Sequence, residues 1–375
     1  MKVCGLIVEY NPLHNGHLYH LQKAKELTDA DIFIAVMSGN FVQRGEFALI
    51  DKWTRAEAAV NAGVDIVFEL PFVFTVQSAT QFGRNAVEIL ANAKCDYLVF
   101  GSETNNLEEL KEIASISFNI DNFKETMKKG YSYPAAYGFF ADSYGPNDIL
   151  AISYLRALQN HPEITPFSVK RTSNYHNDNL DEFLPSAKAI RTALKDNKNI
   201  TDFTPMKELD KYPSPDWNSC YGYIRNLLLN TPKKQLKEIF LMNEGIENHL
   251  YKCAYKSYCF EQFISMAITK RYTRSRIQRT LCHLLIHNTK NDMKQLPEYD
   301  TLRPLAFSLK GQQYLKLLQK QEVKIANNFT ANIKQYRDIE FKAAIAYSIN
   351  MDDDMKEYIT RSEISGLNFK KNNCR

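Results

Sequence analysis

Apolar and amphipathic stretches alternate regularly over the first part of the chain. Strand-like runs rich in Val, Ile and Phe occupy residues 2–10, 31–39, 64–72 and 95–103. Stretches with a helical spacing of apolar residues lie between them, at 16–28, 51–63 and 81–93. This alternation predicts a Rossmann-like parallel sheet with crossover helices, and therefore an α/β fold.

The pattern changes in the second part of the chain. Residues 144–159 predict a turn and a helix, the stretch 164–178 a last short strand, and 184–196 a helix capped by Ser186. A segment with several prolines follows at 204–217, and the pattern beyond it is mostly helical. We therefore predict a parallel-sheet domain at 1–200 and a mainly α-helical C-terminal domain at 201–375.

Three polar loops follow predicted strands, at residues 8–20, 38–46 and 101–103. The carboxyl ends of parallel strands lie on one edge of a sheet, and ligands bind at that edge beside the topological switch point. We therefore expect the three loops to converge on one rim.

The first of these loops reads VEYNPLHNGHLYH. Pro12 stiffens the turn, and Gly16 leaves room for a ligand at the start of the following helix. His14 and His17 are three residues apart, so they point to one side of the first helical turn. There they could hold phosphate oxygens while negative charge shifts during nucleotidyl transfer. The alternative is that His14 caps the turn and His17 is a surface residue; the position after a first strand favours the phosphate role.

The second loop carries three cationic side chains, Arg44, Lys52 and Arg55, in NFVQRGEFALIDKWTR. One of them could recognise a small carboxylate or a nucleic-acid backbone. Alternatively, Asp51 caps the next helix and pairs locally with Lys52 or Arg55. The sequence leaves both interpretations open, and Arg44 is the best candidate because it lies within the loop.

Composition places the chain among ordinary globular proteins, with 44% hydrophobic and 24% charged residues. We find no signal-peptide pattern and no apolar run near the roughly 18 residues that a membrane span needs. The seven cysteines are scattered without paired spacing, which is typical of a reducing compartment. We therefore expect a cytoplasmic protein without a membrane partner.

A net charge of +4 is small, but its distribution is uneven. Residues 264–290 contain no acidic residue, and Tyr272 lies within their basic cluster. This predicts contact with a nucleic-acid backbone, although a solvated helix face is the alternative. The predicted contact residues are Lys270, Arg271, Arg274, Arg276 and Arg279. The nearby Cys253, Cys259, Cys282 and His283 lack C-x-x-C spacing, so we expect core cysteines and no metal site.

HNGH in its position after the first strand resembles the signature of the HIGH-motif nucleotidyltransferase superfamily. Its members catalyse attack on the α-phosphate of ATP with release of pyrophosphate. The superfamily usually has a small residue, Phe, Asp and Pro before the motif, whereas this chain has VEYNP. Together with MSGNFVQRGE, PND and KRYTRSRIQR, that departure resembles the bacterial tRNA(Met) cytidine acetate ligases. The match extends over nearly the whole chain, with its motifs in the same order.

The resemblance implies a two-step reaction. ATP and acetate would form acetyl-adenylate and pyrophosphate, and the acetyl group would pass to the exocyclic amine of the wobble cytidine of elongator tRNA(Met). The N-terminal domain would bind ATP and the C-terminal domain tRNA. We expect Mg²⁺ to be carried by the ATP phosphates, which supply most of its ligands. Glu9, Glu46 and Glu103 could lie near a metal or amine, or could be solvated loop carboxylates.

The resemblance also implies site residues. His14 and His17 would be catalytic. The ATP-binding residues would be Ile7, Val8, Glu9, Tyr10, Asn11, Pro12, Leu13, His14, Asn15, Gly16, His17, Leu18, Tyr19, His20, Gly101, Asn147 and Arg171. The superfamily's second motif is only partly kept in SAKAIR, because Lys188 replaces a threonine. The sequence therefore leaves open whether Arg44 or Arg191 contacts substrate.

Two other function classes remain as alternatives. A small-molecule adenylyltransferase acting on a mononucleotide would use the same first loop, without needing a long second domain with a basic helix. A non-catalytic RNA-binding protein would keep only the scaffold, and His14, Gly16 and His17 argue against it. Residue spacing does not distinguish acetate from another small carboxylate, and it does not predict the oligomeric state.

Overall fold

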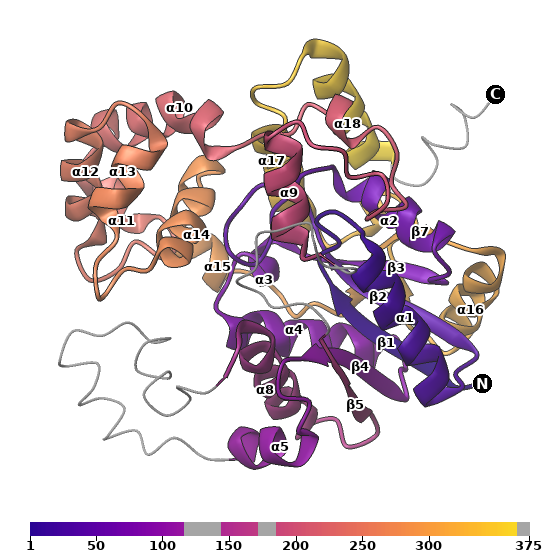
Figure 1. The fold of residues 1–375 in the computed structure, drawn as a ribbon. Helices are drawn as coiled ribbons and strands as arrows, with labels where there is room; N and C mark the ends of the chain where they lie inside the picture. Colours follow the sequence, from indigo (N-terminus) through magenta and orange to yellow (C-terminus); the bar gives the residue numbers. More distant parts are fainter. Residues whose placement is uncertain (116–143, 172–184, 366–375) are drawn as a thin grey trace.

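A six-stranded sheet forms the centre of the molecule (Figure 1). The computed structural model describes residues 1–115, 144–171 and 185–365. The sheet has the order β5-β4-β1-β2-β3-β7. The strands are β1 (Val3–Val8), β2 (Ile32–Ser38), β3 (Ile66–Leu70), β4 (Tyr97–Ser102), β5 (Thr165–Lys170) and β7 (Pro304–Phe307). β1 to β5 pair in parallel, which confirms the predicted α/β fold, and β7 joins antiparallel to β3.

Helices cover both faces of the sheet, so its strands are apolar on both sides. On one face, α1 (Asn15–Thr28) and α2 (Lys52–Asn61) bury Leu21 and Trp53 against the sheet. The other face is covered by α4 (Ala79–Asn92), α5 (Leu107–Ser115), α8 (Pro146–Leu158) and α16 (Leu309–Lys320). The strand order reverses at β1, with β2 on one side and β4 on the other. The topological switch point therefore lies at the carboxyl ends of β1 and β4, where the HNGH loop follows β1 and Gly101 is near the end of β4.

A helical lobe, residues 217–294, lies beyond the sheet, on the left of Figure 1. It contains α10 (Trp217–Asn230), α11 (Lys233–Glu238), α12 (Ile246–Lys256), α13 (Phe260–Ala267), α14 (Arg274–Leu285) and α15 (Lys290–Lys294). Its core is rich in aromatic rings; Trp217 stacks on Phe260 with ring centroids 5.4 Å apart. The predicted mainly helical pattern is thus present in this part of the chain.

After the lobe, the chain returns to the sheet. Besides β7 and α16, this return includes β6 (Thr301–Leu302), β8 (Lys324–Ile325), α17 (Lys334–Tyr347) and α18 (Asp353–Ser365). The remaining short helices are α3 (Phe72–Thr75), α9 (Ala187–Lys195), η1 (Leu209–Lys211) and η2 (Phe329–Ala331). Residues 304–320 therefore pack with the N-terminal sheet, and the division into two domains at residue 200 stays a prediction.

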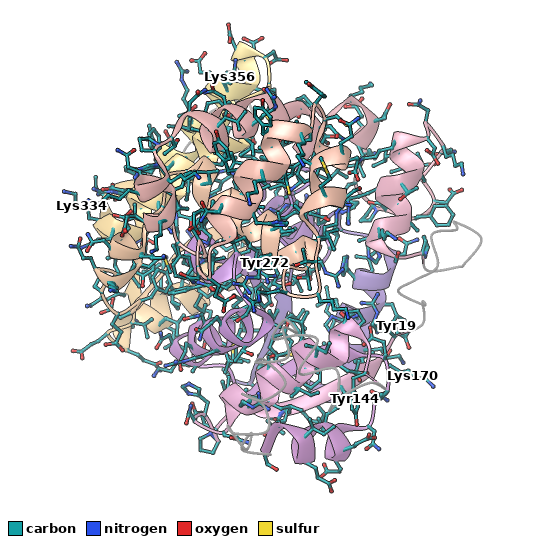
Figure 2. The ribbon with its side chains drawn as sticks, turned by 90° about the vertical axis from the view of Figure 1, so that its left-hand side faces the viewer. Tyr19, Tyr144, Lys170, Tyr272, Lys334 and Lys356 are labelled. Atoms are coloured by element: carbon teal, nitrogen blue, oxygen red, sulfur yellow. The ribbon has the colours of Figure 1, made fainter. Side chains whose placement is uncertain are left out.

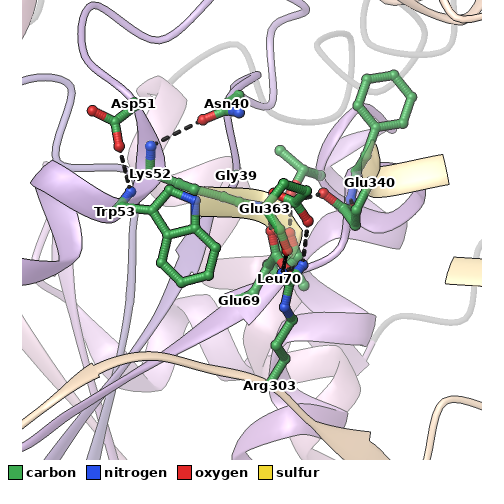
Figure 3. Close-up of polar contacts among 12 residues, drawn as sticks. Gly39, Asn40, Asp51, Lys52, Trp53, Glu69, Leu70, Arg303, Glu340 and Glu363 are labelled. Carbon is green, nitrogen blue, oxygen red and sulfur yellow. Dashed lines mark hydrogen bonds and ion pairs between the residues drawn. The ribbon is translucent and has the colours of Figure 1, made fainter. Parts of the chain in front are cut away.

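Five buried charged side chains join the two halves of the chain (Figure 3). Lys52 Nζ pairs with Glu69 and lies 2.7 Å from Glu363 Oε2. Arg303 Nη1 lies 2.8 Å from Glu69 and 2.6 Å from Glu363, and Glu340 Oε2 is 3.5 Å from Lys52 Nζ. None of the five is more than 4% exposed. Removing one of these side chains would leave a buried charge without its partner. The ion cluster therefore holds α17 and α18 against α2 and β3.

Within the ion cluster, two carboxyl groups are shifted in opposite directions. Burial, with Glu69 nearby, raises the pKa of Glu340 to about 8, although Lys52 opposes the shift. Burial also acts on Glu363, but Arg303 and Lys52 outweigh it and lower the pKa of Glu363 to about 2. Burial and the neighbouring carboxylates therefore favour the protonated form of Glu340, whereas the two cations favour the ionised form of Glu363.

Replacing Glu340 with glutamine should make stability less dependent on pH. The folded chain keeps the Glu340 proton up to about pH 8, whereas the unfolded chain releases it near its ordinary value of 4.5. The contribution of Glu340 to the free energy of unfolding is therefore fully present below pH 4.5. It is lost as the pH rises through about 8. Denaturant titrations across this pH range should show that the free energy of unfolding of Glu340→Gln increases relative to that of the wild type as the pH rises. Glu363→Gln is the matched control and should be destabilised at neutral pH; equal pH profiles for Glu340→Gln and wild type would contradict the assignment.

Cysteine burial and membrane spans were also predicted from the sequence. Cys253 and Cys282 are buried free thiols, as expected, but Cys259 is exposed, which corrects the prediction for that residue. Cys4, Cys95 and Cys220 are also buried free thiols. Cys374 lies outside the described residues. In the described ranges, no helix is long and apolar enough to span a bilayer.

Candidate active site

His14 and His17 stand together at the start of α1. His14 is the N-cap residue, and its Nδ1 accepts a hydrogen bond from the Gly16 N–H at 3.0 Å. His17 Nδ1 accepts from the His14 N–H at 3.3 Å, which completes a capping box. The two rings lie 3.8 Å apart at their centroids. The capping alternative from the sequence is thus present, and it also fixes both rings in place.

Both imidazoles are neutral in the chain without nucleotide. Burial, then the charges of Arg171 and Arg191, lower the pKa of His14 to about 3. Burial also lowers the pKa of His17 well below its usual range, with His14 and Arg171 adding to the effect. Since each Nδ1 accepts a backbone hydrogen bond, each ring carries its proton on Nε2. The loop therefore presents two Nε2–H donors at a helix N-terminus, an arrangement suited to anionic oxygens.

Arg171 and Arg191 bring positive charge to the histidines from separate segments. Arg171 directly follows β5, and a Cβ placed on Gly101 of neighbouring β4 would lie 3.5 Å from its side chain. Arg191, on α9, donates from Nη1 to the Asn11 carbonyl at 2.7 Å. Ser186 caps α9, as predicted, by accepting from the Ala189 N–H. The structure thus brings the predicted Gly101 and Arg171, and the undecided Arg191, around the HNGH loop.

Arg55 has a buried structural position, which favours a local role over contact with substrate. Its Nη1 donates to the Glu9 carbonyl at 2.6 Å, its Nε to Ile50 at 2.9 Å, and its Nη2 to Gly39. One fully buried guanidinium therefore ties the loop after β1 to both ends of the loop after β2. No sequence pattern indicates this clamp, because its acceptors are backbone carbonyls.

Lys52 likewise has a structural position, because it is fully buried in the ion cluster. Asp51 caps α2 by accepting from the Trp53 and Thr54 N–H groups, which confirms the predicted cap. The recorded partner of its other carboxylate oxygen is the Tyr212 hydroxyl rather than Lys52 or Arg55. Arg44 differs from both: it is half-buried, and its charge lowers the pKa of Glu9 against the larger raising effect of burial. Arg44 therefore remains the candidate of the second loop.

Asn147 lies at the N-terminus of α8 and already has a protein partner. Its Nδ2 donates to Glu103 Oε1 at 2.6 Å, and the Asp148 N–H donates to Glu103 Oε2 at 2.9 Å. The buried Asp148 carboxylate in turn accepts from the Glu103 and Thr104 N–H groups. These reciprocal hydrogen bonds join the end of β4 to the start of α8.

The carboxylates proposed as neighbours of a metal are engaged with the protein. Glu9 Oε1 accepts from the Gln43 N–H at 2.7 Å, Glu46 lies 3.7 Å from Arg191, and Glu103 holds the start of α8. Among residues 1–115, 144–171 and 185–365, no group of three His, Cys, Asp or Glu could hold a metal ion. A metal cage built from this chain alone therefore does not fit the described site.

Two residues of the predicted ATP stretch, Leu18 and Tyr19, line a different space. They face a cavity of about 820 Å³ between α1, α2 and the segment 205–212. Tyr10 and Leu13 are 1% exposed and pack in the core. The side chains of the stretch from Ile7 to His20 therefore lie in different surroundings, and the ATP-binding role of the whole stretch stays a prediction.

The predicted tRNA-binding residues differ in exposure. Lys270 and Arg271 are exposed just before α14. Arg274, whose side chain is 45% exposed, pairs with Glu261 at 2.9 Å, and Arg276, 22% exposed, pairs with Glu244 at 3.2 Å. Burial lowers the pKa of Arg279 to about 10. The residues that partly neutralise this basic segment thus come from outside residues 264–290.

The second loop connects the rim to the basic helix. Gly45 has a φ of +74°, and a Cβ there would lie 2.4 Å from the Arg279 backbone nitrogen on α14. The Gly45 carbonyl accepts from Trp217 Nε1 of α10 at 3.0 Å. The charge of Arg44 acts on Arg279 as well, since it lowers the pKa of Arg279 alongside burial. The rim and the basic segment are therefore parts of one connected region.

Comparison with known proteins agrees with this geometry. A family model described as HIGH Nucleotidyl Transferase matches residues 1–362. The tRNA(Met) cytidine acetate ligase of Caldicellulosiruptor saccharolyticus is 39% identical over 86% of either chain, and that of Bacillus subtilis 34% identical over 96% of either chain. The crystal structure of Thermotoga maritima TmcAL bound with alpha-thio ATP has a TM-score of 0.84 and 30% identity, covering 95% of this chain and 96% of that one. The chain therefore belongs to the HIGH nucleotidyl transferase family and, within it, to the tRNA(Met) cytidine acetate ligases.

Proposed function

We propose that this chain activates acetate with ATP and transfers the acetyl group to the wobble cytidine of elongator tRNA(Met). The observation that carries this proposal is the pair of fixed, neutral Nε2–H donors of His14 and His17, flanked by Arg171 and Arg191, in a chain of this family. A mononucleotide adenylyltransferase and a non-catalytic RNA-binding protein remain the alternatives.

In the first step, an acetate oxygen attacks the α-phosphorus of ATP. The bond from that phosphorus to the oxygen bridging the β-phosphate breaks, and pyrophosphate leaves with the electron pair. Charge therefore grows on phosphate oxygens, where His14 and His17 would donate from Nε2 and Arg171 would offer a planar fork. No side-chain nucleophile is needed, since acetate supplies the attacking atom.

In the second step, the exocyclic amine of cytidine attacks the acetyl carbonyl. The carbon–oxygen bond to AMP breaks, AMP leaves with the electron pair, and the amine gives up one proton. The chain's contribution is to hold the adenylate and the base in line, so catalysis rests on positioning and electrostatics. The rim loops would hold the adenylate, and Lys270, Arg271, Arg274, Arg276 and Arg279 would contact the tRNA backbone.

We assign Mg²⁺ to the nucleotide rather than to a protein site. The ATP phosphates would supply most of its ligands and water the others. When bound, the ion would neutralise charge on the leaving pyrophosphate. We place the reaction in the cytoplasm, where ATP, acetate and tRNA are together.

Mass spectrometry of elongator tRNA(Met), after incubation with the protein, ATP and isotopically labelled acetate, tests the proposal. We expect one labelled acetyl group on the wobble cytidine, with AMP and pyrophosphate formed alongside it. Pyrophosphate release with a mononucleotide but not with acetate would support the small-molecule adenylyltransferase instead. A protein that binds the tRNA but not ATP would support the non-catalytic alternative.

A further inference from the structure

Exposed aromatic rings gather on the helical lobe, which faces the viewer in Figure 2. In the part of the chain that the structure describes, the exposed aromatic side chains are Tyr223 (45%), Tyr255 (68%) and Tyr258 (82%). Tyr223 lies on α10, Tyr255 on α12, and Tyr258 in the turn after α12. Other aromatic rings of the lobe, such as Trp217 and Phe260, are packed in its core. The exposed tyrosines therefore present ring surface to solvent, unlike the rings of the lobe core.

Cationic residues occur near two of these rings. Lys252 and Lys256 are exposed on α12 beside Tyr255. The Arg225 guanidinium lies 5.5 Å from the centre of the Tyr258 ring. Arg225 is itself fixed, because its Nε donates to the carbonyls of Ala254 and Ser257 at 3.0 Å. We call Arg225, Lys252, Tyr255, Lys256 and Tyr258 the tyrosine surface.

The lobe as a whole is strongly basic. Residues 217–290 contain twelve Lys and Arg but four Asp and Glu, although the whole chain has a net charge of only +4. Of these carboxylates, Glu244 and Glu261 are paired with Arg276 and Arg274. A basic surface that carries exposed rings is typical of proteins that bind unpaired nucleotides, since bases stack on the rings and phosphates meet the cations. The charge favours a polyanion over a protein partner.

We propose that the tyrosine surface binds unpaired bases of the RNA substrate by stacking on Tyr255 and Tyr258. This inference rests on the proposed function, because that function supplies the RNA. It adds a contact of a different kind from the basic segment before and within α14: the arginines attract phosphates, whereas the tyrosines hold base faces. Arg225 keeps the Tyr258 ring in place, so less side-chain freedom is lost on binding.

The test measures binding of an unmodified tRNA(Met) transcript to the full chain at several salt concentrations. Tyr255→Ala combined with Tyr258→Ala should weaken binding by about tenfold or more. The loss should be similar at every salt concentration, because stacking releases no counterions and leaves the slope of log affinity against log salt unchanged. Tyr255→Phe combined with Tyr258→Phe should bind like the wild type. Leu309→Ala, at an 83% exposed apolar residue on α16, is the matched surface control.

The outcomes separate the inference from the proposed function. If the wild-type chain fails to bind the transcript, the proposed function fails. If the wild type binds and the double alanine variant binds equally well, the tyrosine surface does not contact RNA. A changed salt slope in that variant would also overturn stacking, since it would mean that fewer phosphates are bound. Acetyl-adenylate formation without tRNA should stay at the wild-type rate, which checks that the variant is folded.

Discussion

His17→Ala should slow the formation of acetyl-adenylate by about 10²-fold or more, because it removes a fixed donor to the phosphate oxygens. The fold should survive, since His17 contributes a partly exposed ring and one capping bond at the start of α1. The measurement is acetate-dependent release of pyrophosphate, with the thermal unfolding curve as the folding check. Unchanged pyrophosphate release would show that His17 is structural.

Two further variants separate the roles of the two ring nitrogens of His17. Glutamine can place an amide N–H near the position of Nε2, whereas asparagine can place an amide oxygen near Nδ1, which accepts from the His14 N–H. If donation to phosphate is the function, His17→Gln should keep much of the activity and His17→Asn should lose as much as alanine. The reverse order would assign the effect of the alanine variant to the lost cap.

Reversing the charges of Arg274 and Arg276 to glutamate should produce the largest loss of tRNA affinity. Repulsion would replace two attractive interactions with phosphates, and the slope of log affinity against log salt should flatten by roughly one unit for each phosphate that is no longer bound. Acetyl-adenylate formation without tRNA should change little, because His14 and His17 are held by other segments. The measurement is tRNA binding across a salt series, beside pyrophosphate release.

Removing the ion-pair partners of these arginines is a control that should change tRNA affinity in the opposite direction. Glu261→Gln and Glu244→Gln would free Arg274 and Arg276 from their partners, so tRNA affinity should rise. If the reversal variant loses adenylate formation and tRNA binding together, the start of α14 supports the catalytic loop instead of binding RNA. If neither activity changes, the tRNA contacts another surface.

The sequence predicted the elements whose causes are local. Strands with covered faces read as continuous apolar runs, and the caps Asp51 and Ser186 lie directly before the helices that they begin. The HNGH loop was recognisable for the same reason, since His14, Gly16 and His17 are close in sequence. The local pattern also predicted the parallel arrangement, because alternating strands and helices favour crossover connections.

The parts that sequence reasoning missed depend on distant partners. Arg55 reads as an available cation, yet it is buried among carbonyls that include that of Glu9, 46 residues earlier. Strand β7 is a four-residue run, too short to show a period, and it pairs with β3 more than two hundred residues away. Arg274 and Arg276 looked unopposed because their acidic partners lie on or before neighbouring helices. A charge run within one short stretch therefore does not show which residues oppose it at the surface.

The ion cluster has a consequence for how the protein is made. Synthesis proceeds from the N-terminus, so Lys52 leaves the ribosome long before Glu340 and Glu363 exist. Before Glu340 and Glu363 have been synthesised, Lys52 lacks two of the three carboxylates with which it pairs in the folded chain. Because Glu340 and Glu363 lie on α17 and α18, Lys52 acquires its full set of partners only after residue 363 has been translated. The last two helices therefore complete a charge network that begins in the first sixth of the chain.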